Sequence, residues 1–199
     1  MAGRLGTAIA QTQTFSDPVG FITLTAVGTN GPGSPAYSFL GLGMTRIPAL
    51  RGVVGTVAGT QVPLDSTLTL GQYNSTSNGP LYYIELTSGT SSGFTDDIVS
   101  NDAANVYTAT DDSSVISTGN AFKIFPHWTL GSLFGTNDSA GLKQGGATTA
   151  DQILIQDPAT PLLATFYYNN VSNKTLTPGW RAAGAGGNTD QSQTPFYND

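Results

Sequence analysis

Apolar and polar residues alternate in short runs along most of this chain, and a period of two is typical of half-buried β-strands. The clearest run is residues 81–86 (LYYIEL), in which Tyr82, Ile84 and Leu86 would share one face. The other expected strands are residues 21–27, 53–57, 67–70, 94–99, 105–110, 152–156 and 164–168. Strands that recur at intervals of about 8–12 residues favour an antiparallel sandwich or a barrel-like domain.

Residues 121–135 (AFKIFPHWTLGSLFG) hold three Phe, one Trp and three large aliphatic residues in fifteen positions. Phe122 and Ile124 alternate with less apolar neighbours, which predicts a strand, and Pro126 ends it because proline has no N–H to donate. After Trp128 the apolar residues recur at helical spacing, at Leu130, Leu133 and Phe134. We therefore expect a strand-to-helix corner that fills the core.

One short helix is expected after Trp128. Thr129 is a suitable N-cap, since its hydroxyl can accept a hydrogen bond from a free N–H of the first turn. Gly135 is a suitable stop. The sequence thus predicts an all-β protein with an N-terminal arm (1–16), a β domain (17–181) and a C-terminal tail (182–199).

Composition adds a prediction about the surface. Charged residues make up 10% of the chain, against about 25% in ordinary soluble domains, and Thr, Ser and Asn take their place. Such a surface has little like-charge repulsion between copies, which favours self-association. Seven scattered basic residues and a net charge of −6 argue against nucleic acid as a partner. The sequence also lacks a run of about 20 apolar residues, the length that a membrane-spanning helix needs.

Acidic residues gather in one region and suggest one candidate cofactor, a calcium ion. Hard oxygen ligands on loops between strands suit calcium, although the spacing matches no EF-hand. The candidate ligands are Asp96, Asp97, Asp102, Asp111 and Asp112.

Aromatic residues suggest a second candidate site, a platform for a polysaccharide, with Tyr82, Tyr83 and Trp180 as the candidate residues. The competing interpretation is core packing, because half of the residues in an alternating strand point inward.

The chain contains few of the residues that enzymes use for acid–base or nucleophilic catalysis. The single histidine, His127, lies between Pro126 and Trp128. A role as a packed or hydrogen-bonded corner residue is a simpler interpretation of this position than a role as a general base. Glu85, the single glutamate, reads as a strand-surface carboxylate, and the chain contains no cysteine. We expect no enzymatic activity.

Several short segments resemble an uncharacterised family of secreted all-β proteins from Verrucomicrobia-type bacteria. They are the opening DPVGF at 17–21, SG at 92–93, IVSN at 98–101, FKI followed by PHWTL at 122–130, FG at 134–135, ADQIL at 150–154 and GWR at 179–181. The resemblance implies export and an all-β fold, and it brings no established activity or catalytic residue. Ala8-Ile9-Ala10 is similar to the end of a secretory signal, but its apolar run is shorter than the roughly 7–15 residues that a signal needs, so a remnant signal and an uncleaved N-terminus both stay open. Members of the family usually begin with a full signal peptide and continue with further strands, so we expect a last strand to be missing or supplied by another copy.

Together these observations suggest one leading function and two alternatives. The leading hypothesis is a structural subunit of an extracellular or cell-surface homopolymer (filament, sheath or surface layer), assembled by strand or tail exchange between copies. Either tail can be the donor, through Thr14 and Phe15 or through Pro195, Phe196 and Tyr197. The alternatives are a secreted polysaccharide-binding β module and a viral coat protein.

Overall fold

The computed structural model describes residues 37–39, 46–156, 162–173, 176–185 and 188–197. The chain divides into two compact units, Met1–Met44 and Thr45–Asp199, and every strand and helix of the described residues belongs to the second unit. The predicted strand at 21–27 lies outside the described residues, as do the candidate assembly residues Thr14 and Phe15.

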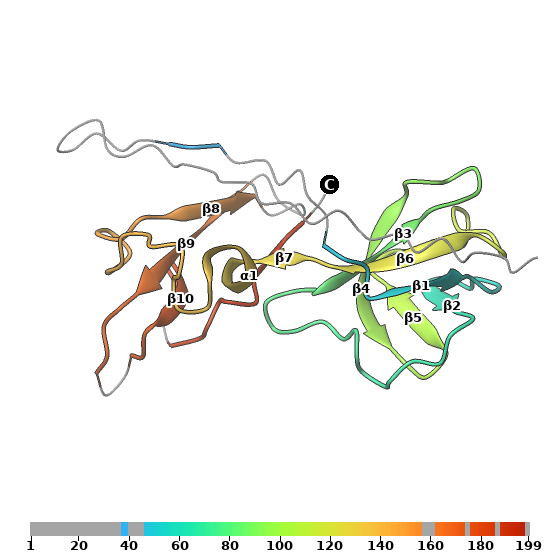
Figure 1. The fold of residues 1–199 in the computed structure, drawn as a ribbon, viewed down its shortest axis with the longest axis horizontal. Coiled ribbons are helices and arrows are strands. Elements are labelled where there is room, and N and C mark those ends of the chain that lie inside the picture. The colour runs from blue at the N-terminus through green and yellow to red at the C-terminus, as the bar shows by residue number, and fades with distance from the viewer. Residues whose placement is uncertain (1–36, 40–45, 157–161, 174–175, 186–187, 198–199) are drawn as a thin grey trace, which may run out of the picture. The chain divides into compact units, whose positions relative to one another are not determined.

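Six antiparallel strands of the described residues form a curled sheet in the order β1-β6-β3-β4-β5-β2 (Figure 1). They are β1 (Leu50–Val53), β2 (Gln61–Pro63), β3 (Tyr82–Leu86), β4 (Thr95–Asn101), β5 (Asn105–Thr108) and β6 (Ala121–Pro126). The two outer strands meet at one end through a bridge between Val54 and Leu64. Gly55 N–H donates to Pro63 C=O there at 2.8 Å, so the sheet closes partway into a barrel.

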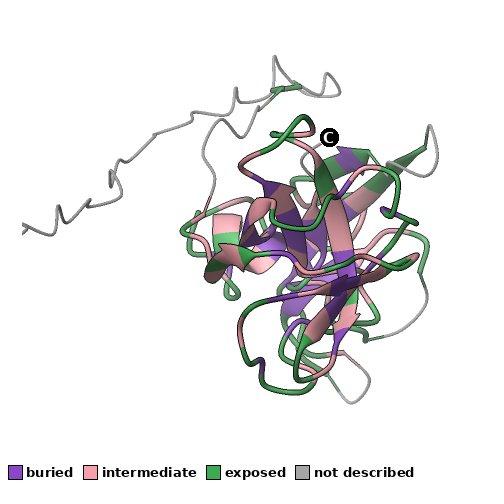
Figure 2. Ribbon diagram, turned by 90° about the vertical axis from the view of Figure 1, so that its right-hand side faces the viewer, coloured by how far each residue is buried: buried purple, intermediate pink, exposed green. Residues whose placement is uncertain are grey.

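Apolar side chains at alternating positions of these strands fill the interior of the barrel. Ile84 and Leu86 point inward and are at most 1% exposed, and Tyr82 packs against the same core, as the period-two pattern predicts. Phe122 and Ile124 of β6 meet them from the neighbouring strand. The purple segments in Figure 2 mark these buried positions on the strands. The predicted strand 67–70 is instead a loop, where Leu68 is buried and its N–H donates to Ala103 C=O at 2.8 Å.

A second, three-stranded sheet has the order β10-β9-β8. Its strands are β8 (Ile153–Gln156), β9 (Leu163–Asn169) and β10 (Gly179–Ala182). The helix α1 (Leu130–Phe134) packs on it, and their shared core holds Leu130, Ile155, Phe166, Tyr168 and Trp180. The Trp180 indole N–H donates to Gly135 C=O at 2.9 Å, which ties the end of the helix to β10.

The short helix forms as the sequence predicts. The Thr129 hydroxyl accepts from Ser132 N–H, the Ser132 hydroxyl accepts from Thr129 N–H, and the two bonds make a capping box. Gly135 follows the helix with a φ of 84°, a conformation that residues with a Cβ rarely adopt.

A third, two-stranded ladder involves the C-terminal segment. β7 (Trp128–Thr129) pairs antiparallel with β11 (Pro195–Phe196). The boundary that the sequence suggests after Arg181 does not separate a tail from the β domain, because Ala182 completes β10 and β11 pairs with the corner strand. Described residues beyond Arg181 are thus integrated into the fold, which is all-β and partly barrel-like, as predicted.

The inward face of β6 should carry much of the stability. Replacing Ile124, which is fully buried, by Ala leaves a cavity and should lower the free energy of unfolding by about 3 kcal/mol in urea denaturation. The control is Val53→Ala on the paired strand β1, where the side chain is 41% exposed and the expected loss is below about 1 kcal/mol. Equal losses for the two variants would contradict this placement of the core.

Candidate functional site

Two of the candidate calcium ligands, Asp96 and Asp112, meet across one threonine hydroxyl. Thr110 Oγ1 lies 2.8 Å from Asp96 Oδ2 and 3.1 Å from Asp112 Oδ1. Asp112 is 1% exposed, and its Oδ2 atom has no hydrogen-bond partner among the described residues. Its main-chain N–H donates to Gly59 C=O at 3.2 Å, which ties the Asp112 backbone to the connection between β1 and β2.

One hydroxyl proton cannot serve two carboxylates. Burial of the carboxyl group, followed by the nearby charge of Asp96, raises the pKa of Asp112 to about 6. When Asp112 is protonated, its O–H donates to Thr110 Oγ1, whose own proton is donated to Asp96. When Asp112 ionises, this chain of hydrogen bonds loses a proton and two negative charges face each other. The arrangement therefore favours a proton on Asp112.

Asp97 lies on the neighbouring position of β4 and makes a different contact. Its Oδ1 atom is 2.7 Å from His127 Nε2. The imidazole is 2% exposed and packs against the rings of Tyr83 and Tyr197, at centroid distances of 4.8 and 5.6 Å. His127 Nδ1 is buried and has no partner within the described residues. His127 thus sits as a packed, hydrogen-bonded corner residue, the simpler of the two interpretations of the sequence.

The carboxylates of Asp102 and Asp111 each accept hydrogen bonds from residues close to them in the sequence. Hydrogen bonds from Ala104 N–H, from the Asn105 side chain and from the Tyr107 hydroxyl lower the pKa of Asp102. The Ser113 hydroxyl and N–H lower the pKa of Asp111 in the same way. The structure does not bring the five carboxylates together, and in the described part of the chain no group of three or more His, Asp or Glu side chains is placed to hold a metal ion.

The three candidate aromatic residues lie mostly inside the protein. Trp180 is fully buried in the second core, and Tyr83 is 4% exposed and stacks on Phe125. Tyr82 is partly buried and packs edge-on against Tyr73 at 4.9 Å. These rings do not form an exposed platform for a sugar.

The C-terminal candidate assembly residues contact the corner of the chain. Pro195 is buried and is the register partner of Thr129, and Phe196 is the partner of Trp128. Tyr197 reaches the imidazole of His127. The candidate donor strand is therefore paired within its own chain.

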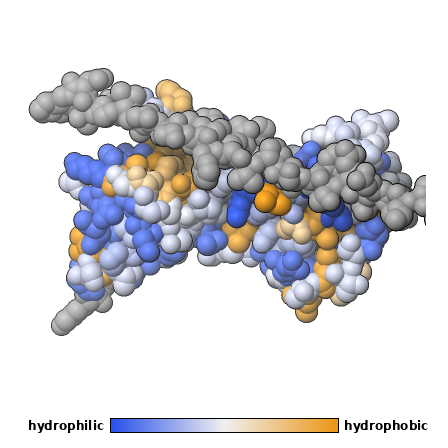
Figure 3. Space-filling model, viewed as in Figure 1, coloured by the Kyte–Doolittle hydropathy of each residue, from blue (hydrophilic) through white to orange (hydrophobic). Residues whose placement is uncertain are grey.

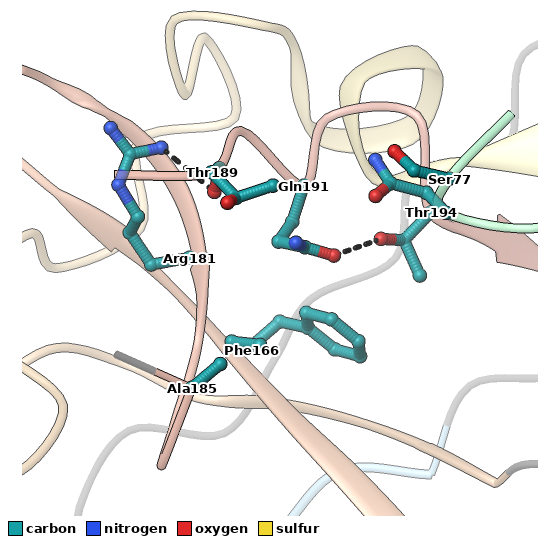
Figure 4. Close-up of a pocket in the computed structure, with 9 residues that line it drawn as sticks. Ser77, Phe166, Arg181, Ala185, Thr189, Gln191 and Thr194 are labelled. Carbon is teal, nitrogen blue, oxygen red and sulfur yellow. Dashed lines mark hydrogen bonds between the residues drawn. The ribbon is translucent and has the colours of Figure 1, made fainter. Parts of the chain in front are cut away.

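A pocket of about 350 Å³ opens between the 76–79 turn and β10. Ser77 and Asn78 line it from the turn, Phe166 from β9, and Gln191 from the C-terminal segment. Figure 4 shows Phe166 on one side of the space and Gln191, hydrogen-bonded to Thr194, on another.

Arg181 is buried beside this pocket and is 4% exposed. Its Nη1 donates to Trp180 C=O at 2.7 Å and to Thr189 C=O at 3.4 Å. Its Nη2 donates to Thr177 C=O at 2.7 Å and to Asn188 Oδ1 at 2.6 Å. The Asp190 carboxylate lies 3.9 Å away, and the guanidinium group holds residues 177 and 188–190 together as one wall.

Sequence reasoning missed Thr110, Arg181 and the pocket residues. The one available signal was Arg181 itself, a charged residue directly after Trp180 in a strand. Its hydrogen-bond partners at 177, 188 and 189 are not predictable from alternation.

Comparisons of the chain with family models, curated proteins and solved structures found no match. Among the described residues there is no helix of the length and apolar character that crossing a membrane requires.

Asp112→Asn should stabilise the protein at pH 8 and not at pH 4. The folded protein keeps a proton on Asp112 that the unfolded chain releases, so the free energy of unfolding falls as the pH rises from about 4 to about 6. An asparagine amide supplies the same donor without ionising, and the gain at pH 8 should be on the order of 2 kcal/mol in urea denaturation.

The matched control is the neighbouring Asp111→Asn. Its pKa is lowered by Ser113, so its ionised form is favoured by folding and this variant should lose stability at pH 8. A loss at pH 8 for both variants would show that Asp112 is ionised and satisfied in the folded protein.

Proposed function

We propose that this protein is a structural subunit of an extracellular homopolymer, in which copies are joined by exchange of the C-terminal segment 191–197. The observation that carries this proposal is the β7–β11 ladder. In the described residues β7 pairs with β11 and with no other strand, so the corner of the chain needs this segment to complete its backbone hydrogen bonds.

The site at β7 and the start of α1 contacts the C-terminal segment through both backbone and side chains. Leu130 N–H donates to Thr194 C=O at 3.1 Å, and Gly131 N–H donates to Ser192 C=O at 2.7 Å. These are N–H groups of the first helical turn, which have no partner inside the helix. Phe196 adds a ring contact with Phe134 at 6.4 Å. The site thus recognises both the backbone and the side chains of the segment.

The linker before this segment suits exchange. Residues 183–187 (AGAGG), which stand in the sequence between β10 and the 188–190 wall, consist of Ala and Gly, so their composition allows an extended path to a neighbour; exchange would release Asn188 and Thr189 from Arg181 of the same chain. If the segment enters the β7 site of another copy, every contact of the acceptor site is kept. Exchange that continues from copy to copy without closing gives a filament.

The sheet edge at β8 offers a second contact between copies. Among the described residues β8 pairs with β9 and has no strand on its other side. It contains no charged residue or proline of the kind that protects natural edges. Leu154 on β8 and Leu163 on β9 are 42% and 57% exposed, and Figure 3 shows apolar side chains beside β8 on this face.

Self-association also agrees with the low charge of the chain, and the extracellular setting rests on the family resemblance. Strand addition between copies supplies main-chain hydrogen bonds without any need for a charged interface.

Disulfide trapping tests the exchange directly, because the natural chain has no cysteine. Thr129 and Pro195 are register partners, so Thr129→Cys with Pro195→Cys should cross-link on oxidation. Exchange between copies predicts a ladder of covalent multimers on a denaturing, non-reducing gel, and monomer after reduction. The control is Glu85→Cys with Thr95→Cys, a register pair inside the barrel sheet, which should give monomer in both gels.

Electron microscopy of the same sample separates the two ways in which this proposal can fail. Polymers that yield cross-linked monomer alone would refute exchange of the C-terminal segment. Monodisperse single copies would refute the polymer itself.

A charge on the β8 edge should weaken contacts between filaments or between copies. Leu154→Lys is expected to reduce light scattering by polymers without lowering the melting temperature, because the side chain is already exposed. Val99→Lys, at a 40% exposed position on β4, is the control and should leave assembly unchanged. If the two variants assemble alike, the β8 edge is not a contact.

A further inference from the structure

The pocket between the 76–79 turn and β10 has the chemistry of a small carbohydrate site. We infer that this pocket, lined by Ser77, Asn78, Phe166 and Gln191, binds one or two units of a neutral saccharide. The inference is independent of the proposed polymer, since the lining residues belong to the fold in either case.

The pocket offers both donors and acceptors, as a ligand rich in hydroxyl groups requires. The Gln191 Oε1 atom accepts from the Thr194 hydroxyl at 2.9 Å, and its Nε2 group makes no hydrogen bond with the described residues. Asn78 is complementary: its Nδ2 donates to Asp190 C=O at 3.1 Å, which leaves Oδ1 as the acceptor. The exposed Ser77 hydroxyl can do both. Each amide is thus oriented by one internal bond and presents its other end.

An aromatic ring forms the apolar part of the lining. Phe166 is 5% exposed and is held from behind by the second core. Ala182 and Ala185 extend this apolar side. Figure 4 shows the Phe166 ring on the side of the pocket opposite to the polar residues. Since only 5% of Phe166 is exposed, a bound sugar would meet the small exposed part of that ring together with Ala182 and Ala185, while its hydroxyl groups meet the amides.

The charge distribution selects a neutral ligand over an anion. Arg181 is the cation of the lining, but four of its N–H groups donate to protein oxygens, and its Nε is buried. The Asp190 carboxylate stands 3.9 Å from it. The guanidinium group therefore positions the 188–191 wall, and the net charge of −6 further disfavours an anion.

The volume is also consistent with this class of ligand. At about 350 Å³ the pocket is near the lower end of small-molecule sites, which begin at about 300 Å³. Ser77 and Ala185 at its rim are exposed, so a longer saccharide can extend into solvent.

Amide NMR spectra of the full chain, titrated with maltotriose, cellotriose, mannotriose and xylotriose, test this inference. At least one of them should move the resonances of Ser77, Asn78 and Gln191, with a dissociation constant on the order of 1 mM. Ser77→Trp, a change at an exposed turn, should block the mouth and abolish the shifts. Gln191→Leu should weaken binding about tenfold, which corresponds to the loss of a hydrogen bond to the ligand.

Matched controls are Gln193→Leu and Ser92→Trp, both at exposed positions outside the pocket, and both should bind as the natural chain does. No shift with any neutral trisaccharide at about ten times that dissociation constant would overturn the inference. Binding of trigalacturonic acid alone, or unchanged binding by Ser77→Trp, would overturn it as well.

Discussion

Burial of the apolar side chains between Ala121 and Phe134 in two different cores is the constraint on which the fold depends. Phe122 and Ile124 belong to the barrel core, whereas Leu130 and Phe134 belong to the core of the second sheet. The chain passes from one to the other through His127, Trp128 and Thr129, of which His127 and Thr129 are buried. Backbone groups along such a path must find partners, because an unpaired buried N–H or C=O costs free energy.

Partners for this connecting stretch come from distant parts of the sequence. His127 N–H donates to Leu81 C=O at 2.9 Å, and the C-terminal segment pairs with β7 and caps the helix. The requirement for a returning strand therefore follows from the corner itself. It also explains why residues 191–197 are held by contacts of the same quality as those in the sheets.

Some buried polar side chains that connect separate segments of the chain each have one atom without a hydrogen-bond partner. Within the described residues these atoms are Asp112 Oδ2, His127 Nδ1 and Arg181 Nε. Each side chain links separate segments of the chain: Asp112 through Thr110 to Asp96, His127 to Asp97, and Arg181 to residues 188–189. The C-terminal segment supplies both β11 and Gln191, so the segment that pairs with β7 also lines the pocket beside β10.

Local periodicity predicted the main described strands and the one helix of this protein, but not the loop at 67–70. Alternation placed Ile84 and Leu86 inside, and the helical spacing after Trp128, with Thr129 as cap and Gly135 as stop, marked the helix. These features depend on neighbours within a few residues, and a sequence displays such neighbours directly. Burial of Trp180 and Tyr83 and the meeting of Asp96 with Asp112 were decided by strand order and register. The partners involved come together only when the chain closes long loops, and no local pattern of side chains records which loops will close.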